Sequence, residues 1–182
     1  MKELEKRGHD VLDLEGYANH RGSLLGSVGL GQQNSQKMFE SYIYEAIRKR
    51  KTNTIVVEGE SKRIGKIIIP EYIFSSMEIG IKIKVDADIE KRVKNIIEEY
   101  VTRNDDELMR ALNLLRKHMS EKNIERYINE IKYKNYELVV EELMTKYYDP
   151  LYNFKNKEFD FTISANNIDD AVDEISKILI KF

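Results

Sequence analysis

Two short segments of this 182-residue chain combine carboxylates, an arginine, a hydroxyl group and glycines. An arginine beside backbone N–H groups that glycine leaves accessible suits a diphosphate or a tRNA phosphate. A carboxylate at the end of a strand suits Mg²⁺ or a general base. The first segment holds Asp13, Glu15, Gly16, Asn19, His20, Arg21, Gly22 and Ser23; the second holds Glu58, Gly59, Glu60, Ser61, Arg63, Ile64 and Gly65.

Both segments also have purely structural interpretations. Glu58 and Glu60 can cap a turn or pair with neighbouring cations, and His20 can be an ordinary loop histidine. His20 has no metal-ligand partner at a fixed spacing, so the sequence does not indicate zinc. The run Arg48–Lys51 is more typical of a solvated helix end than of a nucleic-acid contact.

A phosphate-binding P-loop of the form G-x-x-x-x-G-K-[ST] is absent from the sequence. Gly59 and Gly65-Lys66 come nearest to it, but five residues separate these glycines where the motif has four. Ile67 also stands where the motif requires serine or threonine. The second segment is therefore no Walker A motif.

Hydrophobic patterns predict the elements that position the two segments. Val11–Leu14 predicts a short strand before the first segment, and Thr54–Val57 predicts a buried strand that ends at Glu58. An amphipathic helix capped by Asn34 or Ser35 is expected between the two strands. Ligands of open α/β sheets collect at the carboxyl ends of strands, where both segments lie.

The rest of the chain alternates between the two element types and then becomes helical. We expect a helix end at Lys2–Arg7, a short helix from Pro70 and a third strand over Ile79–Val85. A helical block is expected over residues 86–148, closed by Tyr148-Asp149-Pro150; Phe159, Phe161 and Ile163 predict a late strand, and Ile168 to Phe182 a final helix. This order indicates an α/β fold with a helical insertion over 86–148.

Composition narrows the function classes. The chain has no cysteine, which excludes disulfides, thiolate nucleophiles and cysteine-based zinc or iron–sulfur sites. No apolar run approaches the roughly 18 residues of a membrane span, and the charged N-terminus lacks signal-peptide character. A charged fraction of 34% and a mean hydropathy of -0.55 indicate a soluble chain, for which we expect a cytoplasmic location and no membrane partner.

Charge is distributed unevenly along the sequence. Residues 1–70 carry 12 Lys and Arg against 9 Asp and Glu, a net charge of +3. Residues 71–182 carry 18 against 23, a net charge of -5. The sequence therefore places any polyanion site in the first third of the chain.

The two segments, together with several shorter matches, resemble the signature of tRNA 2-selenouridine synthases. The matching blocks are Val11–Gly16, Ala18–Ser23, Gln33, Ser35-Gln36, Phe39-Glu40, Val57–Ser61, Arg63–Gly65, Pro70 and Tyr147–Tyr152. They occur in the order of that family and extend over most of the chain. The run L-E-G-x-A-N-H-R-G-S is long and unusual, which makes the resemblance more specific than a single glycine motif.

The resemblance implies a P-loop NTPase-like domain with a mostly parallel sheet and helices on both faces. It implies transfer of a geranyl group from geranyl diphosphate to 2-thiouridine at the tRNA wobble position. Selenium from selenophosphate then replaces the S-geranyl group. Proteins of this family also carry an N-terminal rhodanese domain with a catalytic cysteine, and a Walker A motif just before the position of Lys2–Arg7.

This sequence contains neither of those two parts. We therefore expect residues 1–182 to be a single P-loop-like domain that is truncated at its N-terminus. The rest would be supplied by a separate polypeptide, or the chain would be part of a longer gene product. Without the Walker A lysine and the strand before it, we expect weak ATP or GTP binding and little activity by the chain alone.

The resemblance also assigns roles to residues. Asn19, His20, Arg21, Gly22 and Ser23 would line the diphosphate or substrate pocket, with Glu60, Ser61, Arg63 and Gly65 beside them. Glu58 occupies the Walker B position and would hold Mg²⁺ through water, while the catalytic base stays unassigned. Two alternatives remain open, a non-catalytic tRNA-binding module and a generic P-loop NTPase or kinase relative.

Overall fold

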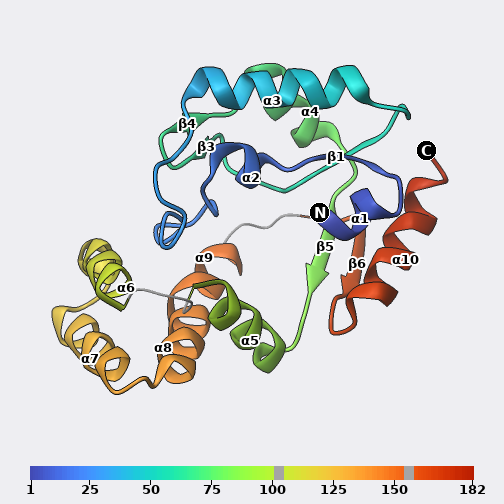
Figure 1. The fold of residues 1–182 in the computed structure, drawn as a ribbon. Coiled ribbons are helices and arrows are strands. Elements are labelled where there is room, and N and C mark those ends of the chain that lie inside the picture. Colours follow the sequence, from blue (N-terminus) through green and yellow to red (C-terminus); the bar gives the residue numbers. More distant parts are fainter. Residues whose placement is uncertain (101–104, 154–157) are drawn as a thin grey trace. The chain divides into compact units, whose positions relative to one another are not determined.

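A computed structural model describes residues 1–100, 105–153 and 158–182 (Figure 1). The chain divides into two compact units. Unit 1 comprises Met1–Asp86 and Phe159–Phe182, and unit 2 comprises Ala87–Glu158. Within the described ranges, none of the helices combines the length and the apolar character needed to cross a membrane.

Unit 1 holds three two-stranded sheets. β1 (Asp10–Leu12) pairs in parallel with β2 (Ile55–Val57), and β5 (Ile83–Asp86) pairs in parallel with β6 (Phe161–Ser164). β3 (Arg63–Ile64) and β4 (Ile67–Ile68) form an antiparallel hairpin. The predicted α/β class is confirmed, but the strands form separate pairs because no described strand hydrogen-bonds to the second edge of β2 or β5.

The helices of unit 1 cover both faces of the β1–β2 pair. They are α1 (Lys2–Lys6), α2 (Leu14–Ala18), α3 (Gln36–Lys49), α4 (Glu71–Ile79) and α10 (Ile168–Leu179). Leu12 and Val57 pack with α3 and α4, whereas Val11 and Val56 pack with α1 and α10. Successive strand residues point to opposite faces, so one strand contributes to two hydrophobic cores.

Helix α3 forms where the sequence predicts it. The Ser35 hydroxyl accepts a hydrogen bond from the Met38 N–H and caps the helix, as expected. Phe39 and Ile43 lie one turn apart and are fully buried against the β1–β2 pair. The cations Arg48 and Lys49 occupy the last turn, where they complement the helix dipole.

All the secondary-structure elements described in unit 2 are helices. It contains α5 (Ile89–Tyr100), α6 (Asp105–Leu112), a 3₁₀-helix (Asn113–Lys117), α7 (Glu121–Lys132), α8 (Tyr136–Leu143), a π-helix (Met144–Tyr148) and α9 (Asp149–Asn153). Part of the predicted helical block, residues 101–104, lies outside the described residues. Arg92 of α5 forms a two-pronged ion pair with Asp149.

Three boundary predictions and one burial prediction were wrong. Leu14 does not extend β1, because Asp13 caps a helix that begins at Leu14. Ile79 ends α4, so the third strand begins only at Ile83. Strand β2 is half-buried rather than buried, because no described strand covers its second edge. The helical run continues past Pro150 to Asn153, and a π-helix precedes the proline, whose ring and missing N–H disturb regular α-helical bonding.

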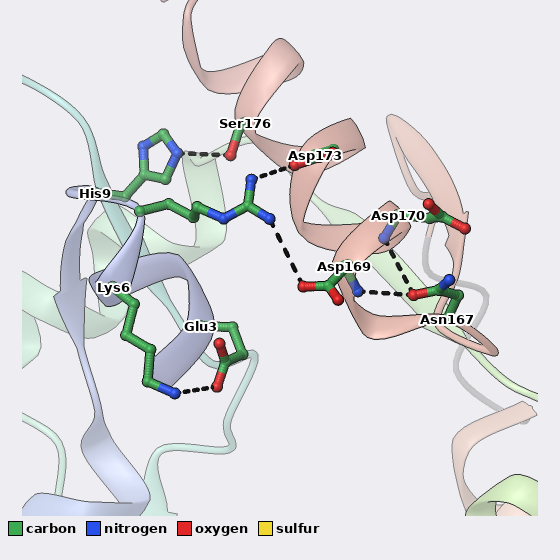
Figure 2. Close-up of polar contacts among 9 residues, drawn as sticks. Glu3, Lys6, His9, Asn167, Asp169, Asp170, Asp173 and Ser176 are labelled. Carbon is green, nitrogen blue, oxygen red and sulfur yellow. Dashed lines mark hydrogen bonds and ion pairs between the residues drawn. The ribbon is translucent and has the colours of Figure 1, made fainter.

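Polar contacts join α10 to the N-terminal segment (Figure 2). His9 Nε2 lies 2.7 Å from the Ser176 hydroxyl, and Arg7 forms ion pairs with Asp169 and Asp173. The side chain of Asn167 accepts hydrogen bonds from the N–H groups of Asp169 and Asp170, which caps α10 at its start.

We expect Asn167→Ala to lower the free energy of unfolding by about 1 kcal/mol, because two helical N–H groups lose their acceptor. Urea unfolding followed by circular dichroism measures the change. Asn129→Ala, at an interior position of α7, is the comparison variant. An equal loss in both variants would contradict a capping role for Asn167.

Candidate functional site

The carboxyl ends of β1 and β2 bring the two predicted segments together. Asp13 follows β1 and Glu58 follows β2, and the backbone N–H of Leu14 donates to Glu58 Oε2 at 2.9 Å. The Asp13 carboxylate accepts the Gly16 N–H at 2.9 Å and also shares a hydrogen bond with Glu58. Parallel pairing of the strands therefore places these acidic groups side by side.

A second acid pair lies next to the first. Glu15 and Glu60 share a hydrogen bond between their carboxyl groups, which requires a proton on one of them. Gly22 packs directly against this pair: a Cβ atom there would lie 2.7 Å from Glu60 Oε1 and 2.8 Å from Glu15 Oε1. Gly22 also has a φ of +67°, so both its conformation and its surroundings require glycine.

The surroundings of Glu15, Glu58 and Glu60 favour the protonated forms of their carboxyl groups. Burial, followed by the charge of Glu60, raises the pKa of Glu15 to about 8. Burial and the hydrogen bond with Asp13 raise the pKa of Glu58 to about 7, and burial also raises the pKa of Glu60. Carboxyl groups that titrate near neutrality are able to donate and accept protons at physiological pH.

His20 is buried in the wall of the site, with 9% of its surface exposed. Its ring lies between two glycines, because a Cβ on Gly26 would be 2.8 Å from His20 Cε1 and a Cβ on Gly65 2.9 Å from Cδ2. Within the described residues, Nδ1 has no hydrogen-bond partner. Burial, and then the charge of Arg21, lowers the pKa of His20, which favours a neutral ring at pH 7.

Two of the predicted binding residues build the glycine-rich loop that follows α2. Asn19 ends α2 in a left-handed conformation with φ +52°, and its amide donates to the carbonyls of Leu30 (2.8 Å) and Gln32 (3.0 Å). Arg21 Nη1 donates to the Val28 carbonyl at 2.7 Å. The guanidinium of Arg21 is therefore partly engaged in holding the loop closed.

Two glutamines attach the β3–β4 hairpin to this region. Gln33 donates to the Ile64 carbonyl at 2.7 Å and accepts the Lys66 N–H at 2.9 Å, so it spans the hairpin turn. Gln36 bonds to both backbone groups of Ile68 in the same way, at 2.8 and 2.9 Å. Each amide side chain thus bonds backbone groups of the hairpin that a neighbouring strand would otherwise satisfy.

The remaining predicted residues divide between turns and the exposed hairpin. Ser23 N–H donates to the Arg21 carbonyl, and the Ser61 hydroxyl donates to the Arg63 carbonyl at 2.8 Å. Gly65, with φ +55°, is the first residue of the hairpin turn. Arg63 is exposed on β3, and no contact among the described residues joins it to the carboxylates.

Sequence reasoning placed Glu58 and Glu60 in the site but left Asp13, Glu15 and Gln33 without roles. Asp13 and Glu15 were placed in the first strand-end segment, but neither was assigned a role of its own. Gln33 gave no comparable signal, since its role depends on the hairpin. The catalytic base stays unassigned, although Glu15 and Glu58 have pKa values suited to that task.

A bound Mg²⁺ ion needs several oxygen ligands arranged around one point. Among the described residues, no three His, Cys, Asp or Glu side chains are arranged as direct ligands of one metal ion. Glu58 already accepts the Leu14 N–H and shares a bond with Asp13. The residues present therefore do not form a direct metal cage, and water-mediated contact through Glu58 stays a prediction.

The sequence matches one protein family over most of unit 1 and part of unit 2. The model of the tRNA 2-selenouridine synthase AAA domain matches residues 2–117. The chain belongs to this family. The AAA-type domain is P-loop-like, which agrees with the predicted fold class.

Individual members of the tRNA 2-selenouridine synthase family match at moderate identity. The protein of Hydrogenovibrio crunogenus is 27% identical over 187 residues, which cover 90% of this chain and 52% of the relative. That of Nitrosomonas europaea is 36% identical over 97 residues, covering 51% and 25%, and that of Shewanella denitrificans is 26% identical over 177 residues, covering 80% and 48%. All three are named tRNA 2-selenouridine synthase.

The chain spans at most about half the length of these relatives. No solved structure matches it. The activity of a complete synthase therefore enters below as a proposal.

Proposed function

We propose that this chain is the P-loop-like part of a transferase that modifies tRNA. The complete enzyme would geranylate 2-thiouridine at the wobble position, using geranyl diphosphate, and would then exchange the geranylated sulfur for selenium from selenophosphate. Family membership over residues 2–117 supports the tRNA-modifying role. The geranyl step rests on the resemblance of the two strand-end segments.

The contact of Gly22 with the Glu15–Glu60 pair carries this proposal. It joins the glycine-rich loop of the first segment to the carboxylates of the second. The two segments that carry the resemblance are therefore parts of one site rather than two unrelated surface loops. A site with proton-holding carboxyl groups beside a glycine-rich loop suits group transfer that needs acid–base assistance.

Binding of an anionic substrate requires that the negative charge of the carboxylates at this site be reduced. Ionised carboxylates at Glu15, Glu58 and Glu60 would repel a diphosphate, whereas their raised pKa values leave protons that reduce this repulsion. We propose that Mg²⁺, held through water at Glu58, would also reduce this repulsion. Arg21, which donates to the Val28 carbonyl at the same loop, would contact the anion.

The proposal also includes a partner. A separate polypeptide would supply the rhodanese and Walker A segments, and tRNA would be the macromolecular substrate in the cytoplasm. No described strand pairs with the second edge of β2 or β5. This agrees with a sheet that accepts further polypeptide, because parallel strands are normally paired and covered on both sides.

Reconstitution tests the function. The chain is mixed with a polypeptide made from the part of the Hydrogenovibrio crunogenus relative that it does not cover, together with tRNA, geranyl diphosphate and selenophosphate. Mass spectrometry of the digested tRNA should show selenated wobble uridine only in the complete mixture. Arg21→Ala should lower the rate about ten-fold, the effect of losing one charged hydrogen bond. Thermal unfolding verifies that this variant folds.

Full activity of Arg21→Ala would show that Arg21 has no role in the site. Absence of product from every mixture would contradict the transferase assignment. A non-catalytic tRNA-binding module is the second candidate. The basic excess of residues 1–70 favours it, and salt-dependent tRNA binding without turnover would distinguish it. Tight ATP or GTP binding by the chain would instead favour a generic P-loop NTPase or kinase.

A further inference from the structure

A groove of about 380 Å³ in unit 1 lies apart from the carboxylate site. Residues of α1, of the connection from α1 to β1, of β1 and β2, of α2 and α3, and of the loop after α3 line it. Helices α1 and α3 pack on opposite faces of the β1–β2 pair, so a groove lined by both follows the edge of β1. Among the described strands, β1 pairs only with β2.

Two tyrosines form one wall of this groove. The rings of Tyr17 and Tyr42 have centroids 5.6 Å apart and are inclined by 36°. Tyr17 packs partly against the core, and burial raises its pKa. Tyr42 keeps 41% of its surface exposed. The pair therefore presents a supported aromatic surface on which a flat ligand can stack.

Two lysines at the end of α3 bring positive charge to the same groove. Lys49 Nζ lies 3.5 Å from Glu45 Oε2, while Lys51 follows the helix and contacts Asp10 through its backbone N–H. The Asp10 carboxylate accepts three hydrogen bonds, from Lys51 N–H and from the N–H and hydroxyl of Thr52. These bonds lower the pKa of Asp10 and hold its carboxylate against the loop after α3.

The other titratable groups of the groove are Glu5, His9 and Glu45. Glu45 is bound by Arg48 at 2.8 Å, and His9 contacts Ser176. Asp10 and Glu45 thus already have partners. Lys49 shares Glu45 with Arg48, so its ammonium group can turn to a phosphate while Glu45 stays paired, and Lys51 lies at the same end of the groove.

We propose that this groove binds one unpaired nucleotide of an RNA, with its base on Tyr42 and its phosphate at Lys49 and Lys51. The inference rests on the proposed tRNA-modifying function and identifies where the RNA is held. Aromatic stacking beside cations is how proteins bind unpaired nucleotides. Backbone groups on the unpaired edge of β1 offer donors and acceptors to the base edge.

Fluorescence anisotropy with the whole chain tests the assignment, using a labelled single-stranded hexauridylate and, separately, an intact tRNA. Tyr42→Ala should weaken hexauridylate binding about ten-fold, within the range measured for loss of one stacked base. Lys51→Gln should weaken it less and reduce the slope of log affinity against log salt by about 0.7, the value for one phosphate contact.

The matched controls lie on the same helix. Tyr44 is 64% exposed and Lys37 is also exposed, but neither lines the groove. Tyr44→Ala and Lys37→Gln should bind both probes like the unmodified chain. If Tyr42→Ala unfolds, Tyr42→Leu keeps an apolar side chain without a ring, and Tyr42→Phe keeps the ring. Weak binding by the leucine variant and normal binding by the phenylalanine variant are then expected.

The outcomes separate this inference from the proposed function. If Tyr42→Ala and Tyr44→Ala bind both probes with equal affinities, the groove is not the RNA site, while the proposed tRNA function still stands. Losses of affinity confined to Tyr44→Ala and Lys37→Gln would indicate that the RNA binds the outer face of α3, which would also overturn the inference. No tRNA binding by the unmodified chain would count against both.

Discussion

Replacing Gly26 by alanine should lower the free energy of unfolding by about 2–3 kcal/mol, the size of a severe overpacking effect. The new Cβ would lie 2.8 Å from His20 Cε1 and 2.9 Å from both His20 Nδ1 and the Ser23 carbonyl oxygen. The imidazole cannot retreat, because Gly65 lies against its opposite edge. The loop must therefore move or the ring must leave its pocket.

Gly59→Ala is the matched control, since a Cβ there would meet no atom within 4 Å and its φ is not positive. Its free energy of unfolding should stay within about 0.5 kcal/mol of the unmodified value or rise slightly. Urea unfolding compares the two variants. The double variant His20→Ala/Gly26→Ala should recover part of the loss, because the ring that clashes is gone. Equal stabilities of Gly26→Ala and Gly59→Ala would contradict a clamped histidine.

Apart from α2, the helices of unit 1 could be predicted from the sequence because their signals are local. Ser35 and the spacing of Phe39 and Ile43 define the start and the buried face of α3, and both depend only on neighbours three or four residues away. The carboxyl-end rule also brought Glu58 near the first segment, because parallel strands end at a common edge.

Features that depend on distant contacts could not be predicted in this way. The β3–β4 hairpin has only two residues in each strand and is held by Gln33 and Gln36, so no periodic pattern in the sequence predicts it. Likewise the continuation of the helical run from α8 into α9, past Pro150, depends on a π-helix that no local sequence rule specifies.

Roles within the candidate site were harder to predict than its position. Asn19 and Arg21 have the side chains of ligand-binding residues, yet both donate to carbonyl groups of their own loop. A polar side chain that closes a loop and one that binds a substrate look alike in a sequence. Only the partner atoms distinguish them, and those atoms come from residues seven to thirteen positions away.

The Glu15–Glu60 pair gives the site a pH dependence that is testable without any substrate. We expect the free energy of unfolding to fall by about 2 kcal/mol between pH 5 and pH 8.5. A carboxyl group whose pKa is raised by folding binds more protons in the folded state than in the unfolded one. Its stabilising contribution is therefore present below the ordinary pKa of about 4.5 and is lost as the pH rises through about 8. The expected loss is smaller than the full shift, at about 1.4 kcal/mol per pKa unit, because the pair is partly solvated.

Glu15→Gln should reduce this dependence and leave the part that comes from Glu58, because an amide cannot ionise and still hydrogen-bonds to Glu60. At pH 8.5 the variant should unfold at higher urea than the unmodified chain, whereas near pH 5 the two should differ little. Glu45→Gln is the control: Arg48 lowers the pKa of Glu45, so that group stays ionised from pH 5 to 8.5 and its replacement should leave the profile parallel. A parallel profile for Glu15→Gln as well would mean that the acid pair does not hold its proton near neutrality, and that acid–base chemistry at this site must come from Glu58 or from a group on another polypeptide.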